Sequence, residues 1–146
     1  MGDKDRGYAH RIDIRAEAQQ VWHALTDVTL LRRWCSPAAE ISPRQGGLFR
    51  ASVDRVSEFE AHIDVFEPGR RLRLIYLRSP GLPPADTVII EDFILEPVTG
   101  GTIVRLLGAG VPTTAEWDTQ YRRLRTGWQA AMTRLKVLVE QQGATS

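Results

Sequence analysis

The chain has 146 residues, of which 42% are hydrophobic and 25% charged, and its formal net charge is +1. These values are typical of one globular domain with a buried core, and the small net charge excludes the strong positive field of many nucleic-acid-binding proteins. A single cysteine, Cys35, excludes an intramolecular disulfide, and the absence of a secretory signal or a membrane-length apolar run favours a cytoplasmic protein.

The N-terminal segment YAHRIDIR, residues 8–15, alternates larger, mostly apolar residues with small or charged ones, which predicts a strand with one buried face. Residues 16–27 and 28–34 then show helical apolar spacing, so we expect two short helices. Residues 35–47 contain prolines and glycines and are expected to form a loop.

Between residues 48 and 109 the apolar residues recur with a period close to two, which predicts an antiparallel meander. The expected strands are residues 48–54, 59–66, 71–77, 87–95 and 102–109. The Pro-rich connection at residues 78–86 is too stiff for a tight hairpin and is expected to form a rim or lid. The strand at 87–95 is apolar on both faces, which favours a second subunit on the outer face and hence a homodimer.

The last element is a long amphipathic helix, for which Thr113 and Glu116 predict a capping box at the start. Gly127 interrupts it beside Trp128. Either a strand or a short helix packs closely there, or Gly127 is a glycine tolerated on the surface. A sheet followed by one amphipathic helix is an α+β arrangement. No repeat or linker divides the chain, so we expect a single domain over residues 1–146 with flexible tails at 1–7 and 143–146.

Catalytic and cofactor motifs are weak. His10, His23 and His62 lie at no metal-ligand spacing from one another or from Cys35, so the sequence predicts no metal site. Cys35 has no identifiable base nearby, and we expect an inert thiol and no catalytic residue of this kind. The glycines of GGLF and GAG do not follow the strand–glycine–helix pattern of a dinucleotide site, so no cofactor is predicted.

Glu91 and Asp92 interrupt the apolar strand at 87–95, and because side chains alternate, one of them must point toward the helix. A buried carboxylate is costly unless it is paired or protonated. The inward acid could orient a ligand or act as a base, or it could be neutralised by an interior partner or by solvent at the rim. The aromatic residues Trp34, Trp117 and Tyr121 lie near loops, where a small-molecule pocket would open.

Several segments together resemble a known family: IDIRAEAQQVWHALTDVTLLRRW, PRQGGLFR, FEAHIDVFEPGRRLRLIY, GGTIVRLLGAG and GWQAAMTRLKVLVE. The chain resembles bacterial members of the Activator of Hsp90 ATPase homologue 1-like family, within the START-like (SRPBCC) helix-grip superfamily. The resemblance extends over residues 8–142. It implies a curved antiparallel sheet of six or seven strands around a long C-terminal helix, two short helices after the first strand, and a cavity between sheet and helix.

The resemblance implies that strand residues facing the helix line this cavity and that Glu91, not Asp92, points inward. With the aromatic and apolar residues of the helices, the expected lining is Trp34, Phe49, Ile63, Leu74, Tyr76, Glu91, Phe93, Val104, Trp117, Tyr121, Leu124 and Trp128.

Three functions follow from these observations. The first is a non-catalytic protein that binds a small apolar or amphipathic molecule, with no cofactor, nucleic acid or membrane as partner. The second is a cyclase-, aromatase- or hydrolase-like enzyme that uses Glu91 or His62 as a base. The third is a co-chaperone-like module that binds a chaperone partner through Arg122, Arg123 and Arg125. The resemblance alone does not imply ATPase stimulation.

Overall fold

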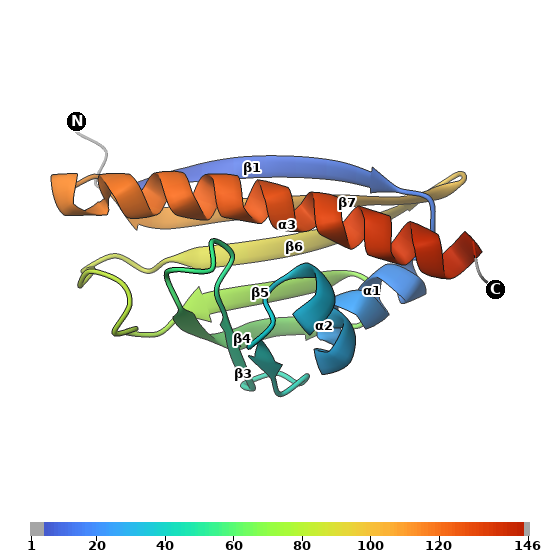
Figure 1. The fold of residues 1–146 in the computed structure, drawn as a ribbon, viewed down its shortest axis with the longest axis horizontal. Coiled ribbons are helices and arrows are strands. Elements are labelled where there is room, and N and C mark those ends of the chain that lie inside the picture. Colours follow the sequence, from blue (N-terminus) through green and yellow to red (C-terminus); the bar gives the residue numbers. More distant parts are fainter. Residues whose placement is uncertain (1–4, 145–146) are drawn as a thin grey trace.

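The computed structural model describes residues 5–144 (Figure 1). Its strands are β1 (Asp5–Ile14), β2 (Glu40–Ile41), β3 (Leu48–Ala51), β4 (Phe59–Glu67), β5 (Arg71–Tyr76), β6 (Ile90–Val98) and β7 (Gly101–Pro112). Its helices are α1 (Ala18–Thr26), α2 (Val28–Trp34), a 3-10 turn η1 (Ala115–Trp117) and α3 (Asp118–Ala144).

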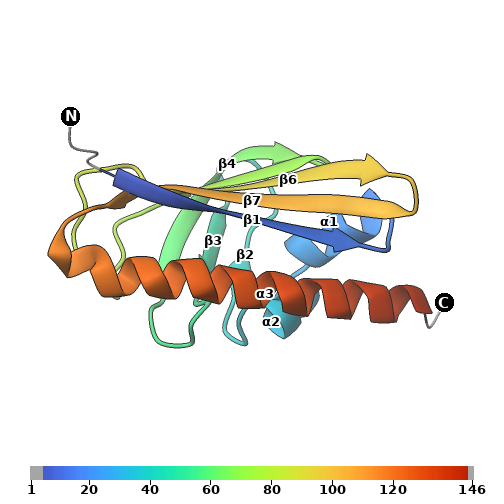
Figure 2. The ribbon, with the colours of Figure 1, turned by 90° about the horizontal axis from the view of Figure 1, so that it is seen from above.

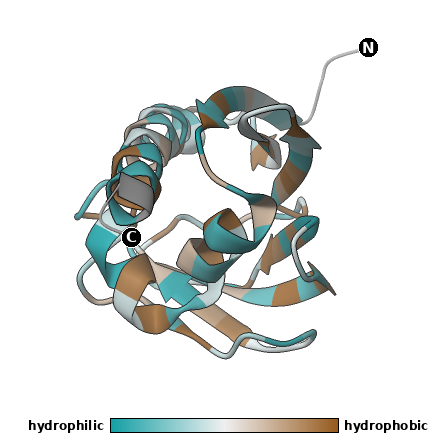
Figure 3. Ribbon diagram, turned by 90° about the vertical axis from the view of Figure 1, so that its right-hand side faces the viewer, coloured by the Kyte–Doolittle hydropathy of each residue, from teal (hydrophilic) through white to brown (hydrophobic). Residues whose placement is uncertain are grey.

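The seven strands form one antiparallel sheet in the order β1-β7-β6-β5-β4-β3-β2. The sheet curves around α3, and α1 and α2 lie beside the C-terminal half of that helix (Figures 1 and 2). Viewed from the end at which α3 finishes, these elements surround a single interior (Figure 3). This is the helix-grip arrangement that the resemblance implies.

Several expected boundaries differ from the structure. β3 ends at Ala51 instead of residue 54, and β6 spans Ile90–Val98 instead of residues 87–95. β2 lies inside the expected loop at residues 35–47 and pairs with β3, but its two residues are too few to show a period. The last helix begins with the 3-10 turn, whose N-cap is Thr114, and α3 starts only at Asp118. Residues 5–7 and 143–144, expected in flexible tails, belong to β1 and α3. The edge strand β1 pairs with β7 from Asp5 onward, and α3 continues to Ala144. Residues 1–4 and 145–146 of those tails lie outside the described residues.

Aromatic side chains fill the middle of the space between the sheet and α3. The Trp128 ring lies 5.4 Å from the Phe93 ring and 6.0 Å from the Phe59 ring, measured between centroids. All three side chains are fully buried. The centre of the fold is therefore packed core, and an open space must lie nearer an end of the sheet.

The outer face of the sheet carries an ion-pair network around Asp92. Both carboxylate oxygens of Asp92 accept hydrogen bonds from Arg71, at 2.7 and 3.0 Å, and Arg73 approaches at 3.4 Å. Asp92 therefore points outward, as the resemblance implies. Val88, four residues before Asp92 in the chain, leaves 61% of its surface exposed. A homodimer through the outer face stays a prediction of the sequence.

Within residues 5–144, no helix has both the length and the apolar character that crossing a membrane would require.

Candidate functional site

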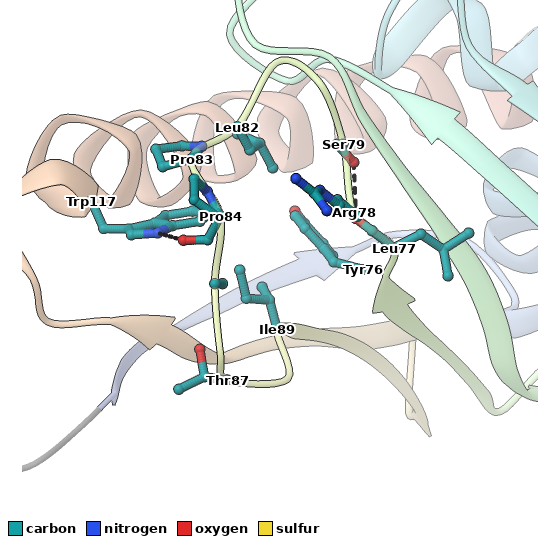
Figure 4. Close-up of a pocket in the computed structure, with 11 residues that line it drawn as sticks. Tyr76, Leu77, Arg78, Ser79, Leu82, Pro83, Pro84, Thr87, Ile89 and Trp117 are labelled. Carbon is teal, nitrogen blue, oxygen red and sulfur yellow. Dashed lines mark hydrogen bonds between the residues drawn. The ribbon is translucent and has the colours of Figure 1, made fainter.

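A cavity of about 250 Å³ lies beneath the connection between β5 and β6, residues 77–89, close to the start of α3 (Figure 4). We call it the rim cavity. Its lining comprises Tyr76, Leu77, Arg78, Ser79, Leu82, Pro83, Pro84, Ala85, Thr87, Ile89 and Trp117. The Pro-rich connection that the sequence predicts as a rim thus supplies most of the wall.

Three hydrogen bonds hold this wall to different parts of the fold. The indole N–H of Trp117 donates to the carbonyl of Pro84 at 3.1 Å. The hydroxyl of Ser79 accepts from the backbone N–H of Glu60 at 2.9 Å, and the hydroxyl of Thr87 donates to the carbonyl of Gly110 at 2.6 Å. The connection is therefore anchored at its beginning, middle and end, which makes the rim cavity largely pre-formed.

Tyr76 joins the rim cavity to a buried acid behind it. Its ring stacks on Phe59, with 4.5 Å between centroids and 2° between planes. Its hydroxyl donates to Glu91 Oε1 at 3.1 Å, and the hydroxyl of Tyr8 on β1 donates to the same oxygen. Two tyrosines from strands on either side of the β6–β7 pair therefore meet at one carboxyl group.

Glu91 has no exposed surface, and its environment sets the protonation state of the carboxyl. Burial raises the pKa of Glu91 to about 8, and the hydroxyls of Tyr8 and Tyr76 and the indole of Trp128 partly oppose this rise. The Trp128 indole lies close enough to Glu91 to stabilise the charged carboxylate. Among the described residues, however, neither Trp128 Nε1 nor Glu91 Oε2 has a hydrogen-bond partner. Near neutral pH the carboxyl is therefore mostly protonated, as in enzymes that keep a carboxylic acid neutral by burial.

Burial also raises the pKa of both tyrosine hydroxyls well above the ordinary value, and the charge of Glu91 adds to the effect. Tyr8 and Tyr76 therefore remain protonated at physiological pH and act as hydrogen-bond donors to Glu91.

The structure separates the residues expected to line one cavity. Tyr76 and Trp117 line the rim cavity, and Glu91 lies behind Tyr76. The residues buried in the hydrophobic core outside that lining are Trp34, Phe49, Ile63, Leu74, Phe93, Val104, Leu124 and Trp128. Tyr121 lies instead beside β1, where its hydroxyl donates to the carbonyl of Gly7 at 2.6 Å.

Sequence reasoning missed two kinds of site residue. It named the 78–86 connection as a rim but selected none of its side chains, although Leu82 and Arg78 both line the cavity. It also missed Tyr8 as the partner of Glu91. The alternation in the first strand places Tyr8 on the inner face, but the pairing depends on the strand order β1-β7-β6, which a sequence pattern does not reveal.

Other candidate groups lie away from the rim cavity. His62 is half-buried between the fully buried Ala61 and Ile63, so alternation directs it to the outer face of the sheet. Burial raises the pKa of the Cys35 thiol to about 12, which keeps it unreactive. Over residues 5–144, no three His, Cys, Asp or Glu side chains gather in a way that could hold a metal ion.

A comparison with known families decides which family this is. The model described as "Activator of Hsp90 ATPase homolog 1-like protein" matches residues 15–140. The chain belongs to this family. No curated protein matches it.

Solved structures share this fold over nearly the whole chain. Protein MLL2253 from Mesorhizobium loti is 23% identical with a TM-score of 0.78, and the match covers 93% of this chain and 98% of that one. The Aha1 dimer from Colwellia psychrerythraea is 20% identical with a TM-score of 0.74, covering 92% and 96%. CalU16 from Micromonospora echinospora is 24% identical with a TM-score of 0.71, covering 92% and 74%. The chain therefore shares the helix-grip fold of these structures. At these levels of sequence identity, the likeness shows the fold alone.

Proposed function

We propose that this family member binds a small, largely apolar molecule in the rim cavity and does not transform it. The observation that carries the proposal is a cavity whose walls are already fixed by hydrogen bonds to the rest of the fold. Its volume of about 250 Å³ lies near the lower end of the range usual for small-molecule sites. The ligand is therefore small.

The chemistry of the lining favours an apolar ligand. Leu82, Ile89 and the ring of Trp117 offer hydrocarbon and aromatic surface, and two prolines of the connection add rigid apolar contacts. Figure 4 shows Leu82 above the cavity and Ile89 below it. Burying a ligand's apolar surface against these groups supplies the binding free energy, at about 25 cal/mol per Å² before the costs of association.

A ligand screen with a filled cavity tests this proposal. Small aromatic and alicyclic compounds are screened against the wild-type protein by native mass spectrometry and thermal shift. Leu82→Trp places a large ring in the rim cavity and should abolish the binding of every accepted compound. Val98→Trp, at an exposed site beside the β6–β7 turn, is the matched control and should bind as the wild type does. A compound that binds Leu82→Trp unchanged would place the site elsewhere.

A second candidate function, proton-transfer catalysis, is favoured by the contact between Glu91 and Tyr76. Tyr76 lines the rim cavity and Glu91 holds a pKa near the operating pH of a general acid or base. A proton could pass between a bound carbonyl compound and Glu91 through the Tyr76 hydroxyl. In such an enzyme Tyr76→Phe and Glu91→Gln would still bind the compound but lose its conversion, measured as a mass or isotope change. Conversion unchanged in Glu91→Gln would remove this candidate.

The co-chaperone-like function stays a prediction. Arg123 lies 4.0 Å from Asp54, Arg125 lies over the Tyr121 ring, and Arg122 donates to Thr119. Each arginine of this cluster therefore already has a partner within the chain.

A further inference from the structure

The polar groups of the rim cavity differ in whether they are still able to bind a ligand. Ser79 donates its hydroxyl hydrogen to the carbonyl of Leu77 at 3.0 Å, and Thr87 and Trp117 donate to backbone carbonyls. The Tyr76 hydroxyl donates to Glu91. All four side chains thus use their donor hydrogens inside the protein, so none of them can donate to a ligand without breaking an existing bond.

Arg78 is the exception. It is the charged residue of the lining, and its guanidinium points over the rim cavity above Tyr76 (Figure 4). Within residues 5–144 it makes no hydrogen bond or ion pair, whereas Arg71 and Arg73 are paired with Asp92 on the outer face. A guanidinium carries five N–H donors and stays charged at all physiological pH values. The mouth of the cavity therefore offers unused donors and a positive charge.

We propose that the ligand is a monocarboxylic acid with a small apolar body, whose carboxylate pairs with Arg78 while the body contacts Leu82, Ile89 and Trp117. This inference rests on the proposed binding function of the rim cavity. The planar fork of one arginine matches a carboxylate with two parallel hydrogen bonds. A phosphate dianion would need a second cation, and the lining supplies none.

The volume limits the size of the acid. About 250 Å³ corresponds to about eight waters at liquid density, which is enough for a compact one- or two-ring body. The carboxylate then lies at the exposed mouth, where it keeps part of its hydration, and the desolvation cost stays small.

Two probes of the same shape test the inference: naphthalene-2-carboxylate, which is an anion, and naphthalene-2-carboxamide, which is neutral. By isothermal titration at low ionic strength, the wild-type protein should bind the carboxylate about tenfold more tightly than the amide, as expected for a charge-assisted pair. Arg78→Met should lower the affinity for the carboxylate to that for the amide and leave the affinity for the amide unchanged. Arg70→Met, on the β4–β5 turn, is the control and should change neither.

Charge reversal sharpens the test. Arg78→Glu should no longer bind the carboxylate and should prefer 2-naphthylmethylammonium, the cation of matching shape. The reason is that the charge at the mouth of the cavity is then negative instead of positive. Equal wild-type affinity for the carboxylate and the amide would overturn the inference while leaving the proposed function intact. Tighter binding of 2-naphthyl phosphate than of the carboxylate would overturn the choice of a carboxylic acid. No binding of either naphthalene probe at millimolar concentration would overturn the inference, and the absence of any bound compound in the wider screen would overturn the proposed function.

Discussion

Glu91 combines complete burial with two hydroxyl donors, and its protonation couples folding to pH. The pKa of the carboxyl is about 8 in the folded protein, against an ordinary value of 4.5. Between these two values the folded chain holds a proton that the unfolded chain releases. The unfolded state therefore binds fewer protons, and the free energy of unfolding falls as pH rises through this window and levels off above it.

Replacing Glu91 by glutamine should remove this pH dependence. At about pH 5 both side chains are neutral, so Glu91→Gln should melt close to the wild type, with a difference of about 1 kcal/mol or less. At about pH 9 the wild type carries a buried charge and the variant does not, so the variant should melt several degrees higher. Melting temperatures measured across this range by circular dichroism check the expectation.

Parallel melting curves for Glu91→Gln and the wild type at every pH would contradict it. Asp92→Asn serves as the control, because Asp92 is the chain neighbour of Glu91 but points to the outer face, where it is paired with Arg71 and Arg73. The melting temperature of Asp92→Asn should therefore not rise relative to that of the wild type between about pH 5 and about pH 9.

Helix α3 carries Gly127 in its interior, where glycine costs about 1 kcal/mol relative to alanine. A Cβ at this position would lie 2.9 Å from Val53 Cγ2 and 3.0 Å from the Val53 carbonyl oxygen. The close neighbour is therefore the β3–β4 connection and not a strand or a short helix, because β3 ends at Ala51, before Val53. Close approach of backbone to backbone explains why the longest helix keeps a weak helix former beside Trp128.

Gly127→Ala should therefore destabilise the protein, although it raises helix propensity. The added methyl must displace Val53, and such overpacking costs about 1–3 kcal/mol, which exceeds the gain in propensity. Urea unfolding monitored by fluorescence measures the difference. At the exposed helix position Ala130, the reverse change Ala130→Gly gives the ordinary cost of glycine as a control. A gain of about 1 kcal/mol in Gly127→Ala would show that the connection moves away freely.

At the scale of the whole molecule, periodicity predicts which face a residue occupies but not what lies opposite it. Alternation requires one of Glu91 and Asp92 to face the helix, the resemblance implies that it is Glu91, and the structure has Glu91 inside and Asp92 outside. The location of the rim cavity could not be predicted, because Phe93 and Trp128 fill the centre of the fold and the cavity lies under the β5–β6 connection instead. The contact between Tyr8 and Glu91 joins positions 83 residues apart and follows from strand order alone.

The central claim, ligand binding in the rim cavity, can be tested on the indole N–H signals of the four tryptophans. Trp117 lines the cavity, whereas Trp22 packs against Phe66 in the core outside the cavity lining. A ¹⁵N-labelled sample is titrated with the compounds that the mass-spectrometric screen retains, and ¹H–¹⁵N correlation spectra are recorded. The Trp117 indole signal should shift with saturation while the Trp22 signal stays in place. Saturable binding that leaves the Trp117 signal unmoved would contradict the account.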